Sequence, residues 1–196
     1  YVLNSGNISS YPDKQRAFFA EFTKGLGQNP KVLILLFSRP REYWEQTFYK
    51  YESQLSSSAP EGVNATFELA MPNTFEQQIK NSDVLYIAGG DDYLLRFWLD
   101  KYDLPKIWDG KVIATSSAGS DVLVSHFWTS DWRMNMDGLG ILPIKFLPHY
   151  NSDYGSDDPY RDPIDWSKAL AELKEYGDKE LPVYSPEEGD FIVIEQ

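Results

Sequence analysis

A serine lies in a run of small residues that follows a predicted buried strand. The run covers residues 116–120 (SSAGS), between an apolar segment at 111–115 and a helical stretch at 121–124. A sharp strand-to-helix turn projects its central residue from the carboxyl edge of the sheet, and only small neighbours let the backbone pass close by. Ser117 could then act as a nucleophile, with the Ala118 N–H facing an oxyanion. A corner that is small for packing reasons alone fits the pattern equally well.

Two histidines are the imidazole bases available to such a serine. His149 ends an apolar strand-like segment within residues 146–150 (FLPHY), which places it at a sheet edge as well. His126 lies nine positions after Ser117 beside large aromatic residues, where a packed or surface histidine is the more common finding. His149 is therefore the stronger candidate, although a satisfied structural histidine also fits its position.

An acidic residue is needed to orient such a base and to stabilise its imidazolium form. Glu188, in a turn at 186–189 (PEEG), and Asp131 are the two candidates that follow the serine. The chain contains 30 acidic residues, so an exposed and solvated carboxylate is the default for either residue taken alone.

A glycine pair follows the fourth predicted strand, at residues 89–90. Glycine lets backbones approach closely, so the Gly90 N–H could be a second oxyanion donor, and a plain strand-to-helix turn also fits. The glycine patterns of dinucleotide and phosphate sites are absent, and no cofactor is expected. An acidic loop at 153–165 lacks the spacing of a calcium loop, and no metal site is expected.

The composition limits the classes of function. Apolar residues make up 42% of the 196 residues and charged residues 24%, which predicts a folded chain. A net charge of −12 argues against binding to nucleic acid or to an anionic membrane surface. Cysteine is absent, which excludes thiolate nucleophiles and disulfides and fits a cytoplasmic setting. No signal peptide pattern opens the chain, and no apolar run approaches the roughly 20 residues of a membrane span.

The candidate residues depend on a predicted α/β architecture. Helical patterns alternate with apolar segments of strand length, which predicts a parallel sheet with helices on both faces. These strand segments lie at residues 1–3, 31–37, 66–71, 84–88 and 111–115. Ser38, and Asn73 with Glu76, are expected to cap helices. The inner face of the helix after the glycine pair is expected to consist of Tyr93, Leu94, Phe97 and Trp98.

The pattern is less regular in the last third of the chain. We expect a strand at 140–147, a polar loop at 151–165 and a helix at 166–176. A closing hairpin is expected to pair 183–184 with 191–194. No linker, repeat or low-complexity tract interrupts the chain, so residues 1–196 are expected to form one domain.

Taken together, these segments resemble the peptidase E (aspartyl dipeptidase) and cyanophycinase family of serine peptidases. They follow the family's order over nearly the whole chain: 88–91 (AGGD), 117–120 (SAGS), 147–150 (LPHY), 181–184 (LPVY) and 188–189 (EG). The resemblance implies a fold like the class I glutamine amidotransferase domain. This is a three-layer α/β sandwich with a mostly parallel central sheet.

The resemblance also implies roles for individual residues. Ser117 would be the nucleophile and His149 the general base, with the N–H groups near Gly90 and Ala118 as the oxyanion hole. The third catalytic member would be Glu188. Asp131 is the reserve candidate, because some relatives carry an acidic residue there after the serine.

Two positions depart from the family pattern, and a third bears on specificity. Thr115 replaces a usual glycine and Asp91 a usual asparagine. Arg161 is the only basic residue between His149 and Lys168, where relatives place arginines that hold an aspartyl side chain. Arg161 is therefore the candidate for substrate binding, while specificity for aspartyl peptides is left open.

The first functional expectation is a cytoplasmic serine peptidase of short peptides that works through an acyl-enzyme, as a monomer or homodimer. An alternative is a catalytically inactive member of the fold that binds a small or peptide ligand, because Asp91 could repel a developing oxyanion. Another ester or amide hydrolase with the same triad also fits the sequence.

Overall fold

A parallel sheet forms the centre of the computed structural model, which describes residues 1–157 and 159–195. In this part of the chain six strands pair in the order β10-β1-β5-β4-β2-β3, and all neighbours except β10 and β1 run parallel. The strands are β1 (Val2–Asn4), β2 (Lys31–Leu35), β3 (Thr66–Leu69), β4 (Val84–Ile87), β5 (Val112–Ser116) and β10 (Phe191–Val193). The predicted parallel sheet is confirmed. Its apolar central strands are buried on both faces, as continuous apolar runs require.

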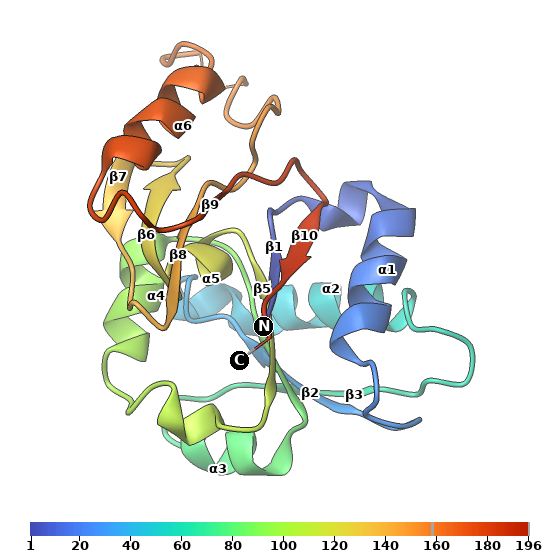
Figure 1. Ribbon diagram of the computed structural model, residues 1–196. Helices are drawn as coiled ribbons and strands as arrows, with labels where there is room; N and C mark the ends of the chain where they lie inside the picture. Colours follow the sequence, from blue (N-terminus) through green and yellow to red (C-terminus); the bar gives the residue numbers. More distant parts are fainter. Residues whose placement is uncertain (158, 196) are drawn as a thin grey trace.

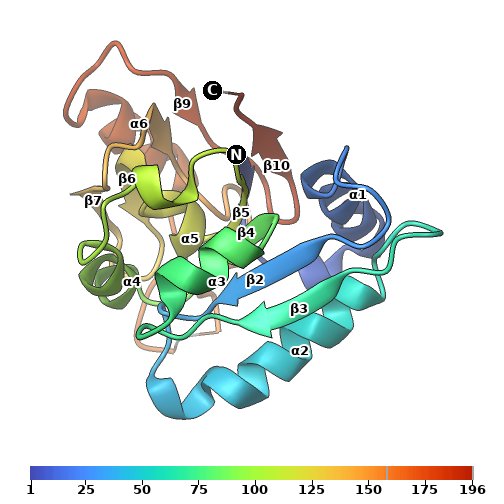
Figure 2. The ribbon, with the colours of Figure 1, turned by 90° about the horizontal axis from the view of Figure 1, so that it is seen from below.

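Helices cover both faces of this sheet (Figures 1 and 2). α2 lies on one side of β2 and β3, and α3 lies on the other. On the α1 and α2 face, Tyr86 of β4 contacts Phe18 and Tyr51. The helices are α1 (Pro12–Phe22), α2 (Trp44–Ser56), α3 (Phe75–Asn81) and α4 (Asp92–Leu99), with 3₁₀ turns η1 (Ile8–Ser10), η2 (Arg41–Tyr43) and η3 (Lys106–Trp108).

A second sheet was not expected from the sequence. Within the described residues its strands pair in the order β7-β6-β8-β9. The strands are β6 (Val124–Thr129), β7 (Met134–Asp137), β8 (Leu142–Phe146) and β9 (Val183–Tyr184). Helix α6 (Trp166–Glu175) packs against it through a separate small core that includes Trp128, Leu147 and Leu173. β8 ends next to the segment that holds His149.

The predicted closing hairpin is wrong. β9 pairs with β8 in the second sheet, whereas β10 pairs antiparallel with β1 at the edge of the main sheet. The turn between them therefore crosses from one sheet to the other (Figure 1). This crossing brings the 186–189 turn beside the N-terminal segment. There the Gly189 N–H donates to the Gly6 carbonyl at 2.9 Å.

Three local predictions are also wrong. The Ser38 hydroxyl caps no helix, and instead donates to the carbonyls of Ala88 and Gly89. The N-cap of α3 is Thr74, which makes no side-chain cap bond, so Asn73 and Glu76 form no capping box. Of the face predicted for α4, Trp98 does pack against the core, but Tyr93 and Phe97 are exposed. The helix buries Leu95 and Leu99 instead, because apolar residues occur all around it. In the described residues no helix has both the length and the apolar character needed to cross a membrane.

Candidate active site

Ser117 occupies a strained turn between β5 and α5 (Ala118–Asp121). Its φ of 50° and ψ of −118° lie outside the regions that a non-glycine residue normally adopts. Such a conformation costs about 1–3 kcal/mol, and it is kept where the surrounding structure imposes it. The Ser117 N–H donates to the Asn4 carbonyl of the neighbouring strand at 3.0 Å. The Ser117 carbonyl accepts from Ser120 and Asp121 at 2.6 and 3.0 Å.

The small neighbours of Ser117 are required by packing. A Cβ on Gly119 would lie 2.2 Å from the Ile87 carbonyl oxygen of β4, so no larger residue fits there. The hydroxyls of Thr115 and Ser120 bond to each other at 2.6 Å, and Ser120 also donates to Asn4 at 2.9 Å. The unusual Thr115 therefore helps to hold the turn.

His149 brings its imidazole directly to Ser117. The Ser117 Oγ and the His149 Nε2 lie 2.9 Å apart. The backbone of His149 is itself unusual, with φ of 56°, and its N–H donates to the Ser5 hydroxyl at 2.7 Å. The ring packs so closely on Gly6 that a Cβ there would lie 2.3 Å from Cε1. The N-terminal strand and its loop thus fix the position of the ring.

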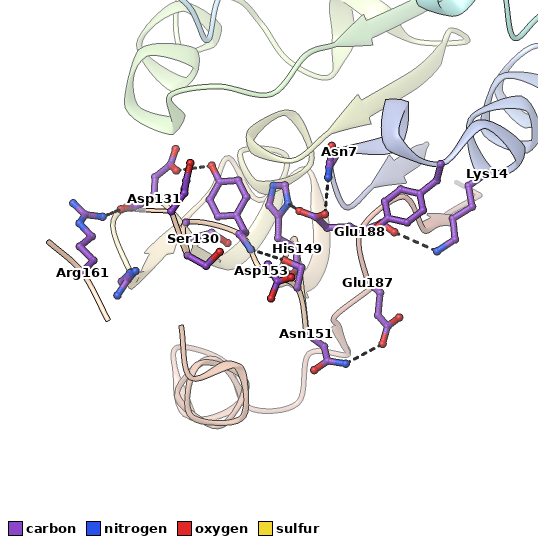
Figure 3. A pocket seen from close by; sticks show the side chains of 17 residues that line it. Asn7, Lys14, Ser130, Asp131, His149, Asn151, Asp153, Arg161, Glu187 and Glu188 are labelled. Atoms are coloured by element: carbon purple, nitrogen blue, oxygen red, sulfur yellow. Dashed lines mark hydrogen bonds and ion pairs between the residues drawn. The ribbon is translucent and has the colours of Figure 1, made fainter. Parts of the chain in front are cut away.

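Glu188 contacts the other nitrogen of the same ring. Its Oε1 lies 2.8 Å from His149 Nδ1, and the side chains are only 5% and 11% exposed. The second carboxylate oxygen accepts from Asn7 Nδ2 at 2.7 Å, as Figure 3 shows. The bond to His149 lowers the pKa of Glu188, with a smaller contribution from Asn7, so this carboxylate is ionised. An ionised acceptor at Nδ1 leaves Nε2 free to take a proton from Ser117.

Asp131 is linked to His149 through Tyr154. Its carboxylate accepts from the Tyr154 hydroxyl at 2.6 Å, and the Tyr154 ring stacks on the His149 ring with centroids 4.0 Å apart. Figure 3 shows His149 between Asp131 on one side and Glu188 on the other. Burial raises the pKa of Tyr154, and the bond to Asp131 raises it further. The sequence analysis missed Tyr154, because an aromatic residue in a polar loop gives no signal of contact with a distant histidine.

Two N–H groups beside Ser117 could bind an oxyanion. Gly90 has φ of 150°, and a Cβ there would lie 2.5 Å from the Ser38 carbonyl oxygen. Gly90, Ala118 and Ser117 line one small cavity. Ala118 is the first residue of α5, so its N–H has no partner within the helix. Neither N–H donates a hydrogen bond to residues 1–157 or 159–195.

Arg161 lies away from Ser117. Its guanidinium donates to the Asp131 backbone carbonyl at 2.7 Å. It lines an outer cavity of about 1050 Å³, whereas Ser117 opens to a neighbouring cavity of about 480 Å³ that Arg161 does not line. Both cavities share His149, Tyr154 and Asp131. The predicted substrate-binding arginine is therefore not brought together with the serine.

Two buried carboxyl groups, also missed from the sequence, lie behind the serine. Asp92 and Asp121 are 3% and 2% exposed, and both line the small cavity next to Ser117. Burial raises the pKa of Asp92 to about 7, although the Thr129 hydroxyl donates to it at 2.6 Å. Burial, with the nearby charge of Asp92, raises the pKa of Asp121 as well. Among the described residues no group of three potential metal ligands gathers, in the acidic loop or elsewhere.

Comparisons with known structures agree with the fold. The fold is similar to that of a peptidase from an acI-B1 Actinobacterium, at 19% identity and a TM-score of 0.61, covering 95% of this chain and 79% of that chain. It is also similar to a protein from Listeria monocytogenes EGD-e that is assigned provisionally as a peptidase E, at 18% identity and a TM-score of 0.58, covering 94% and 88% of the two chains. The comparison with curated proteins found no match.

The family is settled by a match along the sequence. The model of peptidase family S51 matches residues 2–196. This family comprises the peptidase E and cyanophycinase relatives, which have a class I glutamine amidotransferase-like fold. The predicted resemblance and fold class are confirmed, and the chain belongs to the serine peptidases of family S51.

Proposed function

We propose that this protein hydrolyses short peptides, with Ser117, His149 and Glu188 as its catalytic triad. The observation that carries the proposal is the continuous pair of contacts through His149. Ser117 Oγ lies 2.9 Å from Nε2, and Glu188 Oε1 lies 2.8 Å from Nδ1 of the same ring. Family membership supports peptides as the class of substrate.

The first half of the reaction forms an acyl-enzyme. Ser117 Oγ attacks the carbonyl carbon of the peptide while His149 Nε2 takes the hydroxyl proton. Glu188 stabilises the imidazolium, and the N–H groups of Gly90 and Ala118 bind the oxyanion. When the C–N bond breaks, His149 gives its proton to the leaving amine.

The second half releases the acid product. Water attacks the ester carbonyl and gives one proton to His149, and the ester bond to Ser117 breaks. His149 then returns the proton to the Ser117 oxygen, which restores the free enzyme.

Two features support a catalytic rather than a purely binding protein. The Asp91 carboxylate accepts from the Leu94 N–H at 2.7 Å, so its charge is held at the start of α4. The positive end of that helix compensates the charge and weakens its repulsion of an oxyanion. The cavity at Ser117, about 480 Å³, is within the range of small-ligand sites, which supports short substrates.

The test is hydrolysis of a dipeptide panel that includes Asp-X peptides. We expect the wild type to cleave at least one member and Ser117→Ala to lower kcat by about 10⁴-fold or more. Ser125→Ala, which removes a hydroxyl in β6 bonded to the Leu142 carbonyl, is the matched control and should keep the wild-type rate. Equal rates for the wild type and Ser117→Ala would contradict the proposal.

A further inference from the structure

Arg39 differs from the other arginines because its guanidinium has no hydrogen-bond or ion-pair partner in the part of the chain that the structure describes. Its Nε is buried without a partner. The remaining arginines each donate to a carboxylate or a carbonyl: Arg16, Arg41, Arg96, Arg133 and Arg161. Arg133 Nε is also buried without a partner, but Arg133 donates through Nη1 to the Asp162 carbonyl. Buried polar groups are nearly always hydrogen-bonded, so a guanidinium of which no atom is paired, beside a cavity, points to a ligand.

The backbone holds Arg39 firmly beside the proposed oxyanion hole. The Arg39 N–H donates to the Leu36 carbonyl at 3.0 Å, and its carbonyl accepts from Trp44 Nε1 at 2.7 Å. The preceding residue, Ser38, accepts from the Asp91 N–H at 2.9 Å and packs directly on Gly90. The guanidinium therefore extends from a fixed point next to the reacting groups.

Arg39 faces the cavity in which Ser117 and His149 lie. The two acidic residues of that cavity are already engaged, Asp91 with the Leu94 N–H and Asp131 with the Tyr154 hydroxyl. Arg39 also lines two adjoining cavities of about 180 and 420 Å³. Both contain Lys50, and their described lining residues include no acidic side chain. Arg39 and Lys50 thus place positive charge on this side of the site, and neither forms an ion pair with a side chain of the described residues.

We propose that Arg39 binds a carboxylate of the peptide substrate and so determines which peptides are cleaved. The inference deepens the proposed function and rests on it. A planar guanidinium matches a carboxylate in two parallel hydrogen bonds, and such charge-assisted bonds are strong in a partly buried site. The carboxylate belongs either to an acidic side chain or to the C-terminus of a short peptide. Both sources present the same chemistry to Arg39.

Matched peptides separate the two sources. The set is Asp-Ala, Asn-Ala, which lacks the side-chain carboxylate, and amidated Asp-Ala, which lacks the terminal one. We expect Arg39→Gln to lower kcat/KM by roughly 10- to 100-fold for the peptides that carry the recognised carboxylate. The peptide without that group should change by less than about twofold. Arg41→Gln is the control, because Arg41 already pairs with Glu45, and it should leave all three unchanged.

The outcomes distinguish this inference from the proposed function. If Arg39→Gln lowers kcat/KM equally for all three peptides, or for none, carboxylate recognition by Arg39 is wrong although the peptidase stands. If the wild type cleaves no peptide, the proposed function fails, and calorimetric binding of the same three peptides still tests Arg39. Weaker binding by Arg39→Gln of only the peptides with the carboxylate would support the inference. Equal binding, or none to the wild type, would overturn it.

Discussion

The Glu188 carboxylate bonds to the His149 nitrogen on the side of the ring opposite to Ser117, with Oε1 and Nδ1 2.8 Å apart. The N-terminal part of the chain helps to hold Glu188 in this position, because Asn7 donates to the other carboxylate oxygen. Asp131, the alternative acid, is bonded to Tyr154 instead. Glu188 is thus the acid positioned to fix the tautomer of His149.

Replacing each acid by its amide should therefore give unequal effects. Glu188→Gln is expected to lower kcat by about 10²- to 10⁴-fold, because an amide neither stabilises the imidazolium nor enforces the productive tautomer. Asp131→Asn, the matched variant, should lower kcat by less than about tenfold, since it changes only the support of the ring that stacks on His149. Steady-state kinetics of both variants provide the measurement, and a larger loss for Asp131→Asn would reverse the assignment.

Gly90 provides a test of the oxyanion site. In Gly90→Ala the new Cβ would lie 2.5 Å from the Ser38 carbonyl oxygen and φ would be strained, so the N–H must move. Loss of one oxyanion donor lowers kcat by about 10²- to 10³-fold. Gly62→Ala is the control, because Gly62 also has positive φ, 82°, but open space around its Cβ position. Both variants should lose stability, and only Gly90→Ala should lose kcat. Unchanged kcat in a folded Gly90→Ala protein would rule out this donor.

The elevated pKa of Asp92 predicts that stability falls as pH rises. The folded protein keeps this proton up to about pH 7, whereas the unfolded chain releases it near the ordinary value of 3.8. Between these values unfolding releases a proton, so the free energy of unfolding decreases with pH, by about 4 kcal/mol at most. Asp92→Asn removes the titration and should unfold like the wild type near pH 4 but be more stable at pH 8.

Urea unfolding at several pH values measures this difference between Asp92→Asn and the wild type. Both proteins keep Glu188, whose lowered pKa makes stability fall toward acid pH, so this contribution cancels in the comparison. What differs is the titration of Asp92 together with the part of the Asp121 pKa that the Asp92 charge raises. Asp109→Asn changes an exposed residue and should show no pH-dependent gain. A constant difference between Asp92→Asn and the wild type from pH 4 to pH 8 would show that Asp92 does not titrate in this range.

The central elements were predictable because burial leaves a strong signal in the sequence. Strands buried on both faces, such as β2 and β4, are continuous apolar runs, and the small residues around Ser117 are imposed by a close approach to β4. Ser117 and His149 could be paired because each follows a strand.

Other features depend on long-range pairing that local sequence does not specify. β9 and β10 are only two and three residues long, and their partners are chosen by the two sheets. β6 and β7 carry mixed polar and apolar residues, and the second sheet was missed for that reason. Glu188 could not be preferred to Asp131 from the sequence, because the preference depends on the crossing between the sheets. That crossing brings the 186–189 turn to Asn7. The cytoplasmic location, the oligomeric state and the preferred peptide remain predictions.

The most direct test of the proposed mechanism is the site at which a fluorophosphonate probe labels the native protein, read by mass spectrometry of its peptides. An activated serine attacks the phosphorus, the P–F bond breaks with loss of fluoride, and the phosphonyl group stays on the serine oxygen as a stable adduct. The account predicts labelling at Ser117 in the wild type, none in Ser117→Ala, and strongly slowed labelling in His149→Ala. A native protein that stays unlabelled, or that is labelled at another serine, would contradict it.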